Sequence, residues 1–93
     1  MQVKHDASKY TFILLDDADQ EIGYLSYRLG SEGELRATHT KVDPRHEGKG
    51  YAGLLLDALV AYAQSQNLKI VPVCSYVVRA FDKNPDRYAS VIK

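Results

Sequence analysis

The chain has little cysteine, no excess of charge and no long hydrophobic run. A single cysteine, Cys74, excludes an internal disulfide and is typical of a cytoplasmic protein. The formal net charge of +0 argues against nucleic-acid binding, because such domains usually carry a basic excess. Residues 1–10 contain no apolar signal core, and the longest apolar stretch, 51–63, is broken by Gly53 and Asp57. That stretch is too short to span a membrane, so we expect no membrane association.

The composition that is present fits one globular domain over residues 1–93. Hydrophobic residues make up 45% of the chain and charged residues 26%, which is ordinary for a folded domain. We expect a monomer or a weak dimer. The segment 10–15 is predicted to be an exposed strand, and such an edge could pair with a second copy.

Local patterns predict an α/β fold with a mixed sheet and the order β-β-β-α-β-α-α. An antiparallel meander comes first and a β-α-β crossover follows. The expected strands are 10–15, 22–29, 35–42 and 69–74, and the expected helices are 51–66, 75–82 and 85–91, the last capped by Asn84. Simple alternation along 35–42 puts Leu35, Ala37, His39 and Lys41 on one face and Arg36, Thr38, Thr40 and Val42 on the other.

Glycines gather where the crossover begins. Of 6 glycines, Gly48, Gly50 and Gly53 lie just before the apolar helix. The first amides of a helix have no partner within it and point along the positive end of the helix dipole, so they bind anions. The amides of 47–52, with Arg45 and Lys49 beside them, therefore predict a phosphate site.

Two common phosphate motifs do not fit this turn. A Walker A loop needs Ser or Thr after its lysine, and none follows Lys49 at the required place. The G-x-G-x-x-G spacing of dinucleotide-binding proteins is satisfied. However, antiparallel strands precede it and no acidic residue ends a second strand in a repeated βαβ unit, so we interpret that spacing as coincidence.

The pattern R-x-x-G-x-G-x-A, formed by Arg45, Gly48, Gly50 and Ala52, follows a V-x-P strand end and opens an L-L-L helix. It resembles the pyrophosphate-binding motif of the GNAT superfamily of acyl-CoA-dependent N-acyltransferases. With T-H-T-K-V-D-P at 38–44 and P-V-C-S-Y at 72–76, the chain is similar to a small, minimal GNAT-like subfamily over roughly 10–88. The resemblance implies a minimal GNAT-like fold and acetyl-CoA as cosubstrate, without a metal. The acetyl group would pass to an unknown small-molecule or protein acceptor.

The resemblance also assigns residues to the coenzyme. Pantetheine would lie along the strand 38–42, and the pyrophosphate would lie on the amides of 47–52. The implied coenzyme-binding residues are Thr40, Val42, Arg45, Glu47, Gly48, Lys49, Gly50, Tyr51, Ala52 and Tyr76. Ordinary members carry two helices between their first strands, where this chain has only the turns 16–21 and 30–34. The acceptor site is therefore open, differently built or completed by a partner.

Cys74 and His39 are the candidate catalytic residues. Cys74 ends the predicted second parallel strand, where its thiolate could accept the acyl group, although a lone cysteine is also a common small core residue. His39 could act as a general base or could be an ordinary strand histidine. His46 could donate to a phosphate or be solvated, and His5, in an expected tail, has no assigned role.

Other roles for these residues stay open. Tyr76 and Tyr88 could protonate the leaving thiolate or simply pack. The histidines and Cys74 lack the paired spacing of a zinc site. Besides an acetyltransferase, the sequence allows a non-catalytic acyl-CoA-binding module or sensor, and an adaptor whose glycine turn binds nothing.

Overall fold

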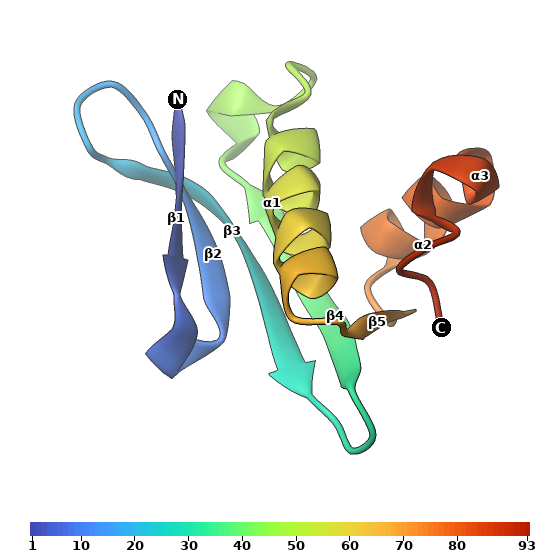
Figure 1. Cartoon of the computed structure of the whole chain (residues 1–93). Coiled ribbons are helices and arrows are strands. Elements are labelled where there is room, and N and C mark those ends of the chain that lie inside the picture. The colour runs from blue at the N-terminus through green and yellow to red at the C-terminus, as the bar shows by residue number, and fades with distance from the viewer.

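A five-stranded mixed sheet forms the centre of the computed structural model, which describes all 93 residues (Figure 1). The strands are β1 (Gln2–Asp6), β2 (Thr11–Leu15), β3 (Glu21–Leu29), β4 (Glu34–Val42) and β5 (Lys69–Pro72), and the helices are α1 (Tyr51–Ser65), α2 (Ser75–Lys83) and α3 (Pro85–Tyr88). The sheet order is β1-β2-β3-β4-β5, antiparallel except for the parallel pair β4–β5. The predicted α/β fold, with a meander followed by a β-α-β crossover, is confirmed.

Strand β1 is absent from the sequence prediction, which treated these residues as a tail. It pairs antiparallel with β2, with His5 opposite Phe12. The two rings stack with 4.1 Å between centroids, so an aromatic contact holds this otherwise polar strand in place. Since β2 is paired on both sides, by β1 and β3, the prediction of a free edge at 10–15 is wrong.

Helix α1 covers one face of the sheet, while α2 and α3 lie beside β5 (Figure 1). Four residues of α1 are buried, as their helical spacing predicts: Leu55, Leu56, Leu59 and Ala63. Every buried residue of the protein is hydrophobic, and the sheet contributes Phe12, Leu14, Ile22, Leu25, Tyr27, Leu35, Ala37 and Ile70 to this core. None of the helices has the length and apolar character needed to cross a membrane.

A β-bulge in β4 reverses the predicted faces of that strand. Ser26 pairs with His39, but the next residue of β3, Tyr27, pairs with Ala37, so Thr38 is inserted between them. Leu35 and Ala37 are buried before the bulge, and Thr40 and Val42 are half-buried after it. His39 and Lys41 are therefore exposed on the face opposite to Leu35 and Ala37, contrary to the expected alternation.

The parallel strands separate where this bulge begins. Pairing of β4 with β5 ends at Ala37 and Pro72, and the carbonyl of Ala37 accepts hydrogen bonds from the amides of Val73 (3.1 Å) and Cys74 (2.9 Å). The chain then turns into α2, with Cys74 as its N-cap residue. The strand predicted to reach Cys74 is therefore shorter, and the last β4 residues have no β5 partner.

The C-terminal helix is shorter than predicted. Helix α3 ends at Tyr88 instead of about Val91, and Ile92 forms a parallel bridge with Ile70. Asn84 does not cap α3 with its side chain, which instead donates to the carbonyl of Ala80 in α2 at 3.5 Å.

Candidate functional site

The loop between β4 and α1 takes its shape from two glycines in the left-handed region. Gly48 and Gly50 both have φ near 78°. A Cβ at either position would meet no atom within 4 Å, so the backbone conformation, and not a neighbouring group, is what requires glycine there. The surface of the loop is therefore open to a ligand.

Five consecutive amides of this loop have no intramolecular acceptor, those of 48–52. The amides before them are engaged, since His46 N donates to the Asp43 carbonyl (2.8 Å) and Glu47 N to the Pro44 carbonyl (3.3 Å). The Glu47 amide, unlike those of 48–52, is therefore already bonded within the loop. The free amides lie at the N-terminus of a helix of 15 residues, where the helix dipole favours an anion.

A cavity of about 300 Å³ lies against these amides. Its lining residues are Thr40, Val42, His46, Glu47, Gly48, Gly50, Tyr51, Ala52, Gly53 and Tyr76. The structure thus brings together most of the residues that the resemblance assigned to the coenzyme. Sequence reasoning left His46 as either a phosphate donor or a solvated residue, and it did not assign Gly53 to the coenzyme although this residue belongs to the glycine turn.

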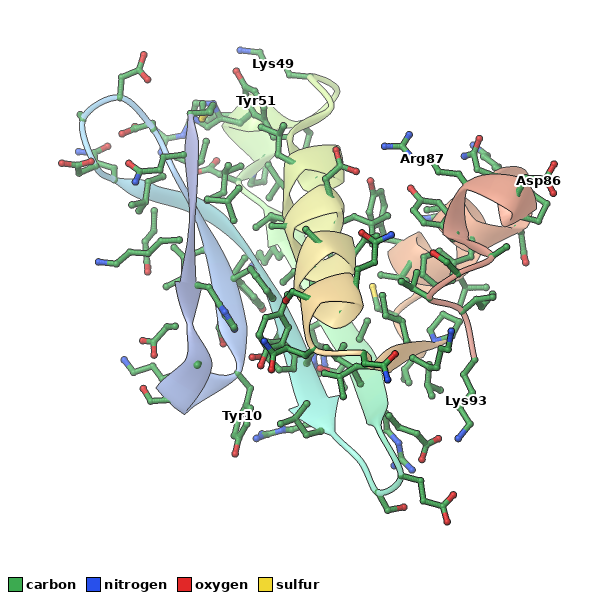
Figure 2. All side chains as sticks on the ribbon, in the orientation of Figure 1. Tyr10, Lys49, Tyr51, Asp86, Arg87 and Lys93 are labelled. Carbon is green, nitrogen blue, oxygen red and sulfur yellow. The ribbon has the colours of Figure 1, made fainter.

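Arg45 and Lys49 do not line this cavity. Arg45 forms an ion pair with Asp43 (3.0 Å) and its side chain is 83% exposed. The side-chain hydrogen bond from Arg45, helped by its backbone amide, lowers the pKa of Asp43 to about 2. Lys49 projects outward from the tip of the loop (Figure 2). Both cations belong to the loop but lie outside the cavity.

His46 has an unsatisfied ring nitrogen at the cavity. Its Nδ1 is buried and has no hydrogen-bond partner. The ring lies 6.1 Å from the ring of Tyr51, measured between centroids. A buried polar atom without a partner is uncommon in proteins and is often completed by a ligand or water.

Cys74 is connected to the cavity through Thr40. The thiol lies 3.4 Å from the Thr40 hydroxyl, which it donates to, and Thr40 lines the cavity. Partial burial raises the pKa of the Cys74 thiol. Hydrogen bonds to the thiolate from the Thr40 hydroxyl and from the amides of Val77 and Tyr76 outweigh that effect, so the pKa is lowered overall. At a given pH, a larger fraction of this cysteine is therefore thiolate than in an unperturbed thiol.

His39 and Cys74, the two candidate catalytic residues, are not brought into contact. The His39 side chain is exposed, and its Nδ1 lies 3.4 Å from the Ser26 hydroxyl. Neighbouring strand residues alternate, so His39 and Thr40 face opposite sides of the sheet, and the bulge puts Thr40 on the side of Cys74. His39 is thus no direct base for Cys74 in this arrangement.

Tyr76 lines both the cavity and a second groove between α1 and the helices α2 and α3. Burial, followed by the nearby Tyr88 and Asp57, raises the pKa of Tyr76, so the phenol keeps its proton and can donate. Tyr88 is buried and stacks on Phe81, with 4.6 Å between centroids, which makes it a packing residue. No group of three or more His, Cys, Asp or Glu side chains could hold a metal ion.

Comparison with known proteins agrees with this geometry. Residues 11–91 match the family described as GCN5-related N-acetyl-transferase, and the chain belongs to this family. The solution structure of a GCN5-like protein from Staphylococcus aureus is 29% identical, with a TM-score of 0.78 over 99% of this chain and 87% of that chain. A search of curated proteins gives no significant match.

More distant structures share the fold alone. Tetrahymena GCN5 is 16% identical, with a TM-score of 0.66 over 80% of this chain and 48% of that one. The N-acetylglutamate synthase from Neisseria gonorrhoeae, complexed with coenzyme A and N-acetyl-glutamate, is 17% identical, with a TM-score of 0.68 over 81% of this chain and 18% of that one. The chain therefore spans less than half of either protein.

Proposed function

We propose that this protein binds acetyl-CoA and transfers its acetyl group. The observation that carries the proposal is the row of free amides at 48–52 beside an open cavity. Phosphate groups bind the free amides at a helix N-terminus, and several adjacent amides can hold a diphosphate. His46 lines the same cavity, and its buried Nδ1 has no hydrogen-bond partner within the protein. Membership of an N-acetyl-transferase family supports coenzyme A as the molecule that carries the diphosphate.

The diphosphate site orients the thioester toward Cys74. From the loop, the half-buried Val42 and Thr40 lead along β4 to the sulfur of Cys74. This part of β4 has no β5 partner, so its backbone groups are free to bond the pantetheine arm.

Cys74 is the acceptor of the acetyl group in the first step of this mechanism. Its thiolate attacks the thioester carbonyl carbon, a new carbon–sulfur bond forms, and the bond to the coenzyme sulfur breaks. The proton lost by Cys74 ends on the departing coenzyme thiol, so one thioester replaces another without an oxidant or metal. Tyr76, a protonated phenol at the cavity, would give its proton to the departing coenzyme sulfur and be reprotonated by the proton that Cys74 loses.

The final acceptor is a small molecule or a protein group. An amine that attacks the acetyl group must lose a proton, and His39 lies on the open face of the sheet, where such an acceptor can approach. Because β4 and β5 separate beyond Ala37, an acceptor on that face would reach the thioester through the gap between the strands, and His39 would serve as its base in the second step or in direct transfer from acetyl-CoA. Replacing His39 with Gln should then slow acetyl delivery to an amine and leave formation of acetyl-Cys74 unchanged.

Intact mass measurement after incubation with acetyl-CoA tests the covalent step. We expect a gain of one acetyl group that is absent in Cys74→Ala and retained in the neighbouring Ser75→Ala control. Absence of the adduct at every time point, in a protein that still binds the coenzyme, would contradict the cysteine route and leave direct transfer.

Calorimetric titration with CoA tests the binding site itself. Gly50→Glu places a carboxylate beside the free amides and should weaken binding by more than about tenfold. Gly33→Glu is a matched control, because Gly33 also has positive φ (74°) but lies in the β3–β4 turn. Equal affinities in the wild type and Gly50→Glu would refute the assignment of the diphosphate to this loop.

A second candidate function is a non-catalytic acyl-CoA-binding module. The turns between β2 and β3 and between β3 and β4 are short, so no helices form an acceptor pocket there. CoA binding without acetyl transfer to Cys74 or to a broad panel of amines and thiols would favour this alternative.

A further inference from the structure

The face of the sheet turned away from α1 is exposed to solvent where β3 and β4 pair. Residues that lie directly opposite each other in an antiparallel pair point to the same side of the sheet. Three such pairs lie on this face: Tyr24 with Lys41, Ser26 with His39, and Arg28 with Arg36. All of them are exposed except Ser26, which is half-buried. They form one continuous surface, the open face of β3 and β4.

The cations of the open face have no acidic partner. Arg28, Arg36 and Lys41 are exposed, and none of them forms an ion pair. Glu34, two residues before Arg36 on β4, already forms an ion pair of 2.8 Å with Lys93. The open face therefore carries three unpaired positive charges in a chain without net charge.

Arg28 and Arg36 lie directly opposite each other although their charges are alike. Like charges at opposite positions destabilise an antiparallel pair. The guanidinium of Arg28 lies 5.8 Å from the ring centroid of Tyr10, and this contact does not neutralise its charge. A carboxylate bound between the two guanidinium groups would offset the repulsion, because arginine binds carboxylates in a bidentate geometry.

The cations are too far apart along β4 for a small acceptor to reach all of them. Arg36 and Lys41 are separated by roughly 15 Å, at a rise of about 3.3 Å per residue, and His39 lies between them. An extended peptide also covers about 3.3–3.6 Å per residue, so roughly five residues are needed to reach both ends. The spacing therefore favours a polypeptide over a single amino acid.

The open face meets the reaction centre at the gap between β4 and β5. Pairing of these strands ends at Ala37 and Pro72, and His39 lies two residues further along β4. An amine held over His39 is thus at the gap that leads to the thioester, with cations on both sides of it.

We infer that the acceptor is a lysine within an acidic segment of a protein. Arg28 and Arg36 bind carboxylates on one side of the lysine, and Lys41 binds those on the other side. A lysine also supplies the nitrogen that an N-acetyl-transferase acylates, which the phosphate backbone of a nucleic acid lacks. This inference rests on the proposed function.

The transfer step balances without a further reactant. The lysine amine attacks the acetyl carbonyl carbon, a carbon–nitrogen bond forms, and the bond from that carbon to sulfur breaks. The amine proton passes to His39 and then to the departing thiolate, so an amide and a thiol are the products.

Fluorescence anisotropy with labelled peptides tests the inference without turnover. Each peptide has one central lysine with aspartates on both sides or with serines on both sides. The wild type should bind the acidic peptide about tenfold more tightly at low salt, and added salt should reduce the difference. The triple variant Arg28→Gln, Arg36→Gln, Lys41→Gln should bind the two peptides equally. Lys9→Gln, which removes a cation from the turn between β1 and β2, should keep the preference.

Acetylation of the same peptides measures the catalytic consequence. The preference in kcat/KM for the acidic peptide should be about tenfold in the wild type and absent in the triple variant, while acetyl-Cys74 forms at the wild-type rate in both. Arg28→Gln relieves the repulsion from Arg36, so its free energy of unfolding should not decrease. That measurement separates lost recognition from lost structure.

Four results would overturn the inference and leave acetyl-CoA binding intact. They are equal affinities of the wild type for the two peptides, equal kcat/KM for free glutamate and the acidic peptide, tighter binding of an oligouridylate than of the acidic peptide, and a dimer in solution that the triple variant converts to a monomer. A protein that binds the acidic peptide but acetylates neither Cys74 nor any peptide would instead contradict the proposed transfer and confirm the open face as the docking surface.

Discussion

Cys74 and His5 show how two similar settings lower a pKa for different reasons, which favours the charged form of Cys74 and the neutral form of His5. Each side chain is half-buried and lies within hydrogen-bonding distance of a hydroxyl, Thr40 for Cys74 and Tyr27 for His5. Around Cys74, donors stabilise the anion enough to outweigh burial. Around His5, aromatic rings surround the imidazole, and burial lowers its pKa against the opposing charge of Asp6.

The Thr40 hydroxyl should control the reactivity of Cys74. Thr40→Val keeps the shape of the side chain but removes the donor, so the thiol pKa should rise and less thiolate should be present at neutral pH. The rate of alkylation by iodoacetamide, measured from pH 6 to pH 10, should therefore shift to higher pH. Thr38→Val on the same strand removes a hydroxyl that bonds Ser26 and should leave the profile unchanged. Superimposable profiles for wild type and Thr40→Val would contradict this role.

His5 should make the stability of the protein depend on pH. Its pKa is lower in the folded chain than the model-peptide value of 6.5, so the unfolded state binds more protons between the two values. The free energy of unfolding should be greatest above about pH 6.5 and should decrease as the pH falls below it. Urea unfolding at a series of pH values from 8 to 5 measures this trend.

The variant His5→Gln should weaken the pH dependence of the free energy of unfolding. It should also lower that free energy at pH 8 by about 1 kcal/mol, because the 2.6 Å hydrogen bond with Tyr27 is lost. The pKa of Tyr27 is raised to about 12 by burial and by Tyr62, so its phenol keeps its proton and donates to the neutral imidazole. His39→Gln, at an exposed position, is the control. If the free energy of unfolding of His5→Gln falls with pH as steeply as that of the wild type, another group causes the pH dependence.

Features set by short-range chemistry were predictable from the sequence, and features set by distant contacts were not. The glycine turn and helix α1 follow from residue spacing alone, and both were predicted. Strand β1 has one aliphatic residue, Val3, and depends on the stacking of His5 on Phe12, which no local pattern contains. The bulge at Thr38 likewise arises from the register between β3 and β4, and it reversed the predicted direction of His39.

The close approach of β3 and β4 beside the site depends on Gly23. A Cβ at this position would lie 2.8 Å from the Lys41 carbonyl oxygen and 3.3 Å from the Val42 Cα, both backbone atoms. Gly23→Ala should therefore push the strands apart and reduce stability by about 1–3 kcal/mol. Since Val42 lines the cavity, CoA affinity should fall as well. Chemical denaturation and calorimetry measure the two effects.

Gly53→Ala is the matched variant in the same protein, and it should act in the opposite direction on stability. Its Cβ would meet only the Tyr76 hydroxyl, at an ordinary contact distance of 3.9 Å. Alanine favours a helix over glycine by up to about 1 kcal/mol, so this variant should be stabilised. Equal stability changes in the two variants would contradict the steric argument.

The proposed coenzyme site draws on three elements of the crossover. Strand β4 carries Thr40, which contacts Cys74, the N-terminus of α1 carries the free amides, and α2 carries Tyr76 at the cavity. Helix α2 makes its main packing contacts with α3 and with the strands β4 and β5. A ligand that contacts β4, α1 and α2 should therefore stabilise the packing of α2 against the sheet.

Coenzyme binding should consequently stabilise the entire domain. A ligand at 100 times its Kd adds about 2.7 kcal/mol to the free energy of unfolding. For a chain of 93 residues, 1 kcal/mol raises Tm by about 4–8 °C, so CoA should raise Tm by more than about 10 °C. Differential scanning calorimetry with CoA should show one transition that moves as a whole in the wild type and in Gly33→Glu, and much less in Gly50→Glu. A transition that stays in place at saturating CoA would contradict binding at the folded site, and a transition that splits would show that α2 unfolds separately from the sheet.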